Sequence, residues 1–330
     1  MIIFYLFVCA SFLQTCLTDN GNNYIMYSNH KMYRIQGNED GMDKTMDFLT
    51  ENYDIPYHSR TEKGCHMLVA PELAPIVESI SQTHGLATKV IYDDFSELIR
   101  VEKNNKRANE EFSWTAYYDV DDIYNYLQNM SDQHPQWAQL VVGGQSYEGR
   151  QILGLRINTP TDVNKPVMFI ESDYGSSSNP CNYQTYAGSQ PFSEIETRSL
   201  SEYISGLENM LGYISFHADA QMLLLPYSDS SEHIDNYDDL KQIGDASLRR
   251  GYAVNKAKYD GPGTASEILY KASGGSIDWV RYTQGTRLVY VYELRGRFFQ
   301  WPASRIHEQG DEVTQMMAGL VSEARNLGYF

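Results

Sequence analysis

Two residues at the ends of apolar segments carry side chains that could take part in chemistry. His217 ends the run YISFH, and Glu293 ends the run RLVYVYE. A neutral imidazole is a common zinc ligand, and a carboxylate that follows an apolar strand is poorly solvated, which raises its pKa and favours work as a general base. Each residue also has a simpler interpretation. His217 could be a hydrogen-bonded structural histidine, and Glu293 could form a salt bridge with Arg295 or Arg297.

The segments around these two residues alternate between strand and helix patterns. The predicted strands are 138–142, 151–157, 165–171, 210–217 and 287–293, and the predicted helices are 119–130, 193–209, 238–254 and 306–327. Strands that alternate with helices are typical of an α/β domain with a mixed or largely parallel sheet. Such a sheet would hold both side chains at the ends of its strands.

Residues 18–107 have a different pattern, which predicts a small α+β domain. The predicted strands are 30–36, 65–71 and 87–94, and the predicted helices are 41–53, 75–84 and 95–101. A β-α-β-α-β order over so few residues suits a ferredoxin-like fold. The polar stretch that follows contains Lys106 and Arg107. It is either a site for a trypsin-like protease, cut at Arg107, or only a solvated linker.

The N-terminus predicts the compartment. Residues 2–13 form the apolar run IIFYLFVCASFL, which is too short for a membrane span of about 20 residues and suits a signal peptide over residues 1–17. The Asn129-Met130-Ser131 sequon is consistent with that route. We therefore expect a secreted, extracellular protein with no membrane span after signal removal.

The charge balance argues against nucleic acid as a partner. The chain has 26 Lys and Arg against 43 Asp and Glu, a formal net charge of −17. A general nucleic-acid binder needs a basic footprint that this composition does not supply.

Six further segments follow one another in a fixed order. They are FSWTAYYDVDDIYNYL (112–127), SYEGRQILGLRI (146–157), SSSNPCNYQTYAG (176–188), SFHADAQMLLLPY (215–227), YKASGGSIDW (270–279) and YELRGR (292–297). The ordered set resembles the zinc-dependent carboxypeptidases of the digestive A/B type. Residues 18–107 resemble the activation propeptide of that family, and residues 108–330 resemble its catalytic domain.

The resemblance implies a role for each candidate residue. His217 matches a zinc ligand, and Glu293 matches the residue that activates the zinc-bound water. Tyr270 matches the tyrosine that closes over the substrate's C-terminal residue. Ile277 matches the position that sets the side-chain preference, and an apolar residue there implies aromatic or aliphatic C-terminal residues. The implied partners are peptide or protein C-termini and an activating trypsin-like protease.

One block of the family pattern is absent. The family carries a His-x-x-Glu pair, which supplies the other two zinc ligands, between the strand resembling KPVMFIE and the stretch resembling SSSNPC. Here Asp173 runs directly into Tyr174, and none of the eight histidines has Glu three positions later. One imidazole cannot hold zinc usefully, because zinc sites share the ion among three or four ligands. We therefore expect this chain to bind no zinc and to be inactive.

The same gap bears on the cysteines. Cys9 and Cys16 lie in the predicted signal peptide, so Cys65 and Cys181 either pair with each other or both remain thiols. The family counterpart of Cys181 pairs with a cysteine inside the absent block. The resemblance therefore implies that Cys181 has lost its partner.

Three hypotheses follow from the gap. The chain could be a carboxypeptidase precursor that lacks an internal coding segment, through splicing or an incomplete gene model. It could instead be a non-catalytic secreted protein that binds peptide C-termini. Finally, its propeptide could act alone as an inhibitor of active carboxypeptidases. The retention of His217, Tyr270, Ile277 and Glu293 favours the first hypothesis.

Overall fold

A computed structural model shows two compact units in the chain. The smaller unit spans Leu13–Asn109, and the larger unit combines Met1–Phe12 with Glu110–Phe330. The structure describes residues 3–7, 27–53, 55, 57–61, 64–104, 112–159, 164–172, 189–269, 271, 273–296 and 301–330.

The smaller unit has a four-stranded antiparallel sheet in the order β3-β4-β2-β5. Its elements are β2 (Lys31–Gln36), α1 (Glu39–Asn52), β3 (Tyr57–Thr61), β4 (Gly64–Val69), α2 (Ala74–Thr83), β5 (Ala87–Tyr92) and α3 (Ser96–Asn104). The order from β2 to β5 is β-α-β-β-α-β, and this sheet order is that of a ferredoxin-like fold. The sequence pattern missed β3, which supplies the fourth strand.

The apolar periodicity of α1 explains how this unit buries its core. Asn38 caps the helix, because its side-chain oxygen accepts a hydrogen bond of 2.7 Å from the backbone N–H of Gly41. Met42, Met46 and Leu49 recur on one face of the helix and are buried against the sheet.

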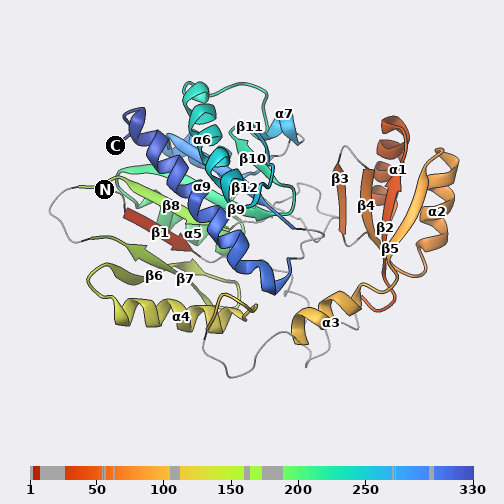
Figure 1. Cartoon of the computed structure of the whole chain (residues 1–330), viewed down its shortest axis with the longest axis horizontal. Coiled ribbons are helices and arrows are strands. Elements are labelled where there is room, and N and C mark those ends of the chain that lie inside the picture. The colour runs from red at the N-terminus through yellow and green to blue at the C-terminus, as the bar shows by residue number, and fades with distance from the viewer. Residues whose placement is uncertain are drawn as a thin grey trace. The chain divides into compact units, whose positions relative to one another are not determined.

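The larger unit contains an eight-stranded mixed sheet in the order β11-β10-β12-β9-β8-β1-β7-β6 (Figure 1). The strands are β1 (Ile3–Phe7), β6 (Ala138–Gln145), β7 (Gln151–Ile157), β8 (Val167–Glu171), β9 (Met210–Ala218), β10 (Met222–Leu225), β11 (Asp260–Thr264) and β12 (Leu288–Leu294). β8, β9 and β12 run parallel, whereas β10 is antiparallel to β12. The predicted α/β class with a mixed sheet is confirmed.

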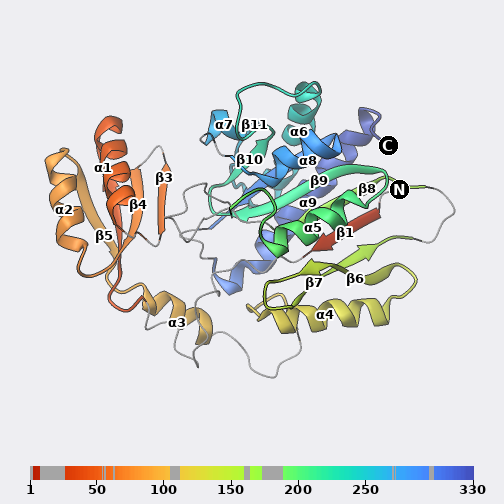
Figure 2. The same ribbon diagram turned by 180° about the vertical axis from the view of Figure 1, so that it is seen from behind.

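Helices cover both faces of this sheet, which gives three layers. They are α4 (Val120–Gln133), α5 (Ile195–Ser205), α6 (Tyr237–Asn255), α7 (Ala265–Ile268), α8 (Ser276–Gln284) and α9 (Ile306–Asn326), with a short 3₁₀ turn at Ala303–Arg305. α6 and α9 lie over the face seen in Figure 1, and α5 and α8 lie over the face seen in Figure 2. None of the helices that the structure describes is long and apolar enough to cross a membrane.

The two apolar layers follow from strand alternation. Met168 and Ile170 of β8 pack in the cluster that includes Met316 of α9, whereas Val167 and Phe169 pack in the opposite cluster. Successive side chains of a strand point to opposite faces, so a central strand covered on both sides must be apolar throughout. All five residues of β8 are buried.

The first strand of the sheet comes from the segment for which the sequence predicts a signal peptide. Ile3–Phe7 forms β1, and it lies between β8 and β7. An apolar run rich in β-branched and aromatic residues suits either role, because the same composition favours membrane insertion and a buried strand.

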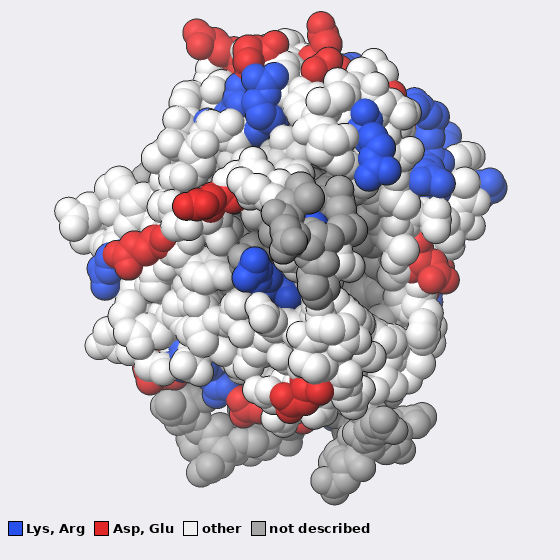
Figure 3. Space-filling view, turned by 90° about the vertical axis from the view of Figure 1, so that its left-hand side faces the viewer, with Lys and Arg blue, Asp and Glu red and all other residues white. Residues whose placement is uncertain are grey.

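Charged side chains of both signs lie interspersed on the face shown in Figure 3. In that view, several Lys and Arg side chains gather at the upper right.

Candidate active site

His217 and Glu293 lie next to each other at the carboxyl ends of two neighbouring strands. β9 and β12 run parallel, and their register sets Glu293 directly opposite His217. The carboxyl ends of parallel strands are where α/β sheets place their ligand sites. Strand pairing therefore brings together two residues that are far apart in the sequence.

Both ring nitrogens of His217 face polar partners. Its Nδ1 lies 3.7 Å from Oε1 of Glu293, and its Nε2 lies 2.9 Å from Oγ of Ser215. Ser215 precedes His217 by two residues on the same strand, so their side chains point to the same side. The side chains of His217 and Glu293 are 20% and 15% exposed, which leaves them within reach of solvent.

Burial controls the protonation of Glu293. The loss of solvent around its carboxyl group, with the nearby charge of Asp219, raises its pKa to about 7. A carboxyl group with a pKa near neutral pH is suited to proton transfer. The structure thus supports the physical argument made from the apolar strand that precedes this residue.

The alternative salt bridge with Arg295 does not form. Arg295 is buried, and its guanidinium group contacts Glu308 at 2.7 Å and Glu312 at 3.1 Å. Arg297, the other candidate partner of Glu293, lies outside the described residues.

Ser215, His217 and Glu293 follow the order of a nucleophile, a base and an orienting carboxylate. That arrangement would require the serine to reach a substrate. Ser215 is completely buried, and the 3.7 Å separation of His217 and Glu293 exceeds a hydrogen bond. Ser215 therefore holds the imidazole in place and is not a nucleophile. The period-2 pattern of YISFH could have indicated this residue, because it shares a face with His217.

The described residues do not fit a zinc site. Among them, no group of three or more His, Cys, Asp and Glu side chains lies close enough to hold a metal ion. A catalytic zinc needs three protein ligands. The described residues therefore support no catalytic step through a metal.

Ile277 is the second residue of α8 and is buried. Its side chain is 3% exposed and packs in the apolar cluster that contains Val280. The next residue, Asp278, accepts hydrogen bonds from the backbone N–H groups of Ser228 at 2.9 Å and Asp229 at 3.2 Å. The structure therefore fastens the start of α8 to the loop that follows β10.

Asp278 was not singled out from the sequence. Its signal was an acidic residue in the first turn of a helix that begins directly after Gly275. Burial raises the pKa of Asp278 to about 6, against the effect of its backbone donors.

Other predicted features lie outside the described residues. These are Tyr270, the cleavage site at Arg107, Cys181 and the junction between Asp173 and Tyr174. Cys65 is described. It is fully buried in the smaller unit, and its thiol donates to the carbonyl oxygen of Ile35 at 3.8 Å.

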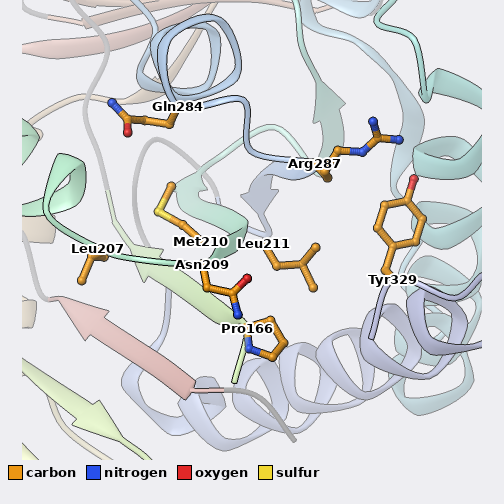
Figure 4. A pocket seen from close by; sticks show the side chains of 8 residues that line it. All are labelled: Pro166, Leu207, Asn209, Met210, Leu211, Gln284, Arg287 and Tyr329. Carbon is orange, nitrogen blue, oxygen red and sulfur yellow. The ribbon is translucent and has the colours of Figure 1, made fainter. Parts of the chain in front are cut away.

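A separate hollow of about 410 Å³ lies at the opposite ends of the strands (Figure 4). It is lined by Pro166, Asn209 and Arg287, which directly precede β8, β9 and β12, and by Tyr329. Arg287 is already paired with Asp235 at 3.0 Å. Because His217 and Glu293 lie at the carboxyl ends of β9 and β12, this hollow is not part of the candidate active site.

The sequence model of the family described as "Zinc carboxypeptidase" matches residues 123–174 and 171–316. These two matches cover more than half of the chain. The chain belongs to the zinc carboxypeptidase family. The family consists of metallocarboxypeptidases, which are hydrolases, so the resemblance read from the ordered segments is confirmed.

Two insect relatives extend the match. The chain is 26% identical to zinc carboxypeptidase A 1 of Drosophila melanogaster over 414 residues, covering 93% of this chain and 94% of the relative. It is 29% identical to the zinc carboxypeptidase of Simulium vittatum over 304 residues, covering 65% of this chain and 98% of the relative.

A solved structure has the same fold. The carboxypeptidase A of Helicoverpa armigera superimposes with a TM-score of 0.77 at 18% identity, covering 92% of this chain and 100% of that one.

The comparisons also locate a discontinuity. The two matches to the family meet at residues 171–174, directly after β8. The Drosophila alignment runs over 414 residues, although this chain has only 330. The Drosophila relative therefore carries residues for which this chain has no counterpart.

Proposed function

We propose that this chain is a form of a secreted zinc carboxypeptidase precursor that lacks an internal block and has no peptidase activity of its own. The complete form would remove aromatic or aliphatic C-terminal residues from peptides and proteins. The observation that carries the proposal is the break in the family match at residues 171–174, together with the retained pair of His217 and Glu293.

The residues that remain support the family function for the complete form. Glu293 has a pKa of about 7, which suits a general base, and it faces His217, which would be a zinc ligand in the complete form. Ile277 would set the apolar preference, and Tyr270 would cover the C-terminal residue of the substrate. Activation would follow from a cut at Arg107 by a trypsin-like protease.

The shortage of ligands supports inactivity of the 330-residue chain. The described residues offer no group of three metal-binding side chains, and the sequence holds no His-x-x-Glu pair. Without a third ligand, zinc binding would be no stronger than at a surface histidine.

Two measurements test this proposal. The purified chain, nicked by trypsin near Arg107, is assayed for bound zinc and for release of a C-terminal phenylalanine from a peptide. The Drosophila relative serves as the positive control, and His217→Ala serves as the matched variant. We expect no stoichiometric zinc and no release from either form of this chain. Stoichiometric zinc that is lost in His217→Ala would contradict the proposal.

Sequencing of full-length transcripts tests the origin of the gap. We expect a form with additional codons between Asp173 and Tyr174. If every transcript joins these two residues directly, the precursor interpretation is wrong.

A further inference from the structure

Strand β1 holds a central position in the sheet of the larger unit. Phe4 to Phe7 pair antiparallel with residues 154–157 of β7, and Ile3 to Leu6 pair parallel with residues 167–170 of β8. Figures 1 and 2 show β1 between these strands from both sides. Without β1, the sheet order divides into β11-β10-β12-β9-β8 and the hairpin β7-β6.

The position next to β8 needs a strand. All five residues of β8 are buried, and Val167, Met168 and Phe169 are at most 4% exposed. A buried strand without a partner leaves backbone N–H and C=O groups unpaired, at about 1–3 kcal/mol for each group. β8 already pairs with β9 on its other edge, so its remaining edge must be covered.

The absent block would follow β8 in the chain. The two parts of the family match meet at residues 171–174, and β8 ends at Glu171. A strand parallel to β8 is normally reached from it through a crossover connection of a dozen or more residues. The block is at the correct place in the chain to supply such a crossover and such a strand. Its loss would leave the position vacant.

The N-terminal segment has the composition that this position requires. A strand buried on both faces reads as a continuous apolar run with β-branched and aromatic residues. Ile3–Phe7 has the sequence IFYLF. With β1 in this position, β8 and β7 belong to one continuous sheet.

We propose that Ile3–Phe7 replaces a strand of the absent block in this chain, so that the larger unit folds only while this segment stays attached. Removal of residues 1–17 as a signal peptide and pairing of β1 in the sheet exclude each other. A chain of this length that loses its N-terminal segment therefore has an open sheet and is not secreted as a folded protein. The proposal does not depend on whether the chain binds zinc.

A disulfide cross-link tests the pairing directly. Tyr5 lies opposite Arg156 in the antiparallel ladder. Such pairs have Cα atoms about 4.5–5.5 Å apart, within the range that a disulfide spans. In a full-length chain whose native cysteines are replaced by serine, Tyr5→Cys with Arg156→Cys should form the cross-link under mild oxidation.

The matched control moves the second cysteine along the same strand. Gln151 is exposed and lies five residues from Arg156, about 17 Å along β7. Tyr5→Cys with Gln151→Cys should give at least tenfold less cross-linked peptide by mass spectrometry. Equal yields for the two pairs would overturn the proposal.

Secretion supplies the second test. A foreign leader with its own cleavage site is placed before Met1 or before Thr18, and amide hydrogen exchange of β8 is measured in the secreted protein. We expect a soluble protein with protected β8 amides only when residues 1–17 are retained. Secretion of the chain that begins at Thr18, with equal protection of β8, would overturn the proposal. If that chain only aggregates, the cross-link yields decide the outcome.

Discussion

Burial acts on two carboxyl groups, one at the end of β12 and one in α8, and their partners differ. Glu293 faces an imidazole, whereas Asp278 receives backbone N–H groups from the loop after β10. Loss of solvent is the largest cause of the raised pKa in both residues. The backbone donors of Asp278 stabilise its ionised form without overcoming the cost of burial.

The raised pKa of Asp278 predicts a pH-dependent stability. Its pKa is about 6 in the folded chain, against an ordinary value of 3.8. Between these values the folded chain holds a proton that the unfolded chain releases, so this group lowers the free energy of unfolding as pH rises from about 4 to 6. In the parent chain we expect this group to lower the free energy of unfolding by on the order of 2 kcal/mol over that pH range. Asp278→Asn should abolish this decline. The measurement is urea unfolding at several pH values.

An exposed aspartate provides the control for this prediction. Asp311 lies in the exposed part of α9, and Asp311→Asn should leave the decline unchanged. The explanation by burial fails if Asp278→Asn and Asp311→Asn show the same pH dependence as the parent chain.

At the scale of elements, close packing of α6 and α9 forms one layer of the larger unit. Gly319 of α9 faces the backbone of α6, and an added Cβ would lie 2.8 Å from the carbonyl oxygen of Ala246. Gly310 lies on the same helix, and an added Cβ there would have nothing within 4 Å. Close packing of the two helices thus requires glycine at position 319, whereas position 310 has room for a side chain.

Substitution of these two glycines should have effects of opposite sign. Gly319→Ala forces the helices apart and should lower the free energy of unfolding by about 1–3 kcal/mol. Gly310→Ala removes backbone freedom from the unfolded chain and should raise it by about 0.5–1 kcal/mol. Urea unfolding of both variants checks the prediction. A loss of stability of the same size in both would show that the packing of Gly319 is not the cause.

The elements that could be predicted from the sequence are those whose own apolar residues form a helical face or a continuous strand-length run. The helix α9 has an apolar face, and β8, β9 and β12 are long apolar runs. β11 has the sequence DGPGT, which gives no strand signal because glycine and proline dominate it. β11 is a strand because its backbone pairs with that of β10. The role of Ile3–Phe7 depends on a vacancy elsewhere in the chain, so no local pattern could have indicated it.

At the scale of the whole molecule, the candidate site was predicted in part. His217 and Glu293 could be found because each ends an apolar run, but only the register of β9 and β12 shows that they face each other. Asp278 could not be separated from ordinary acidic residues without its partners, whereas Ser215 could have been found because it shares a strand face with His217. The gap after β8 needed comparison with a family pattern, because an absent segment leaves no residues to interpret.

The smaller unit has an apolar core made of its own residues. Cys65 belongs to that core with Ile35, Met67 and Val77, and is fully buried. A cut at Arg107, the predicted cleavage site, would therefore leave the smaller unit with the core that it needs to keep its fold. We expect residues 18–107 expressed alone to protect Cys65, their single cysteine, from a thiol reagent. Unfolding in urea should speed the reaction by on the order of 100-fold or more, because the thiol reacts only after the core opens.

A matched variant separates burial from slow chemistry in this last prediction. Cys65→Ser with Glu39→Cys moves the cysteine of the isolated residues 18–107 to an exposed position at the start of α1. Its thiol should react at the same rate with and without urea, because no opening of the core is required. If Cys65 reacts in buffer as fast as this exposed cysteine, the smaller unit does not fold by itself, and its core depends on the remainder of the chain.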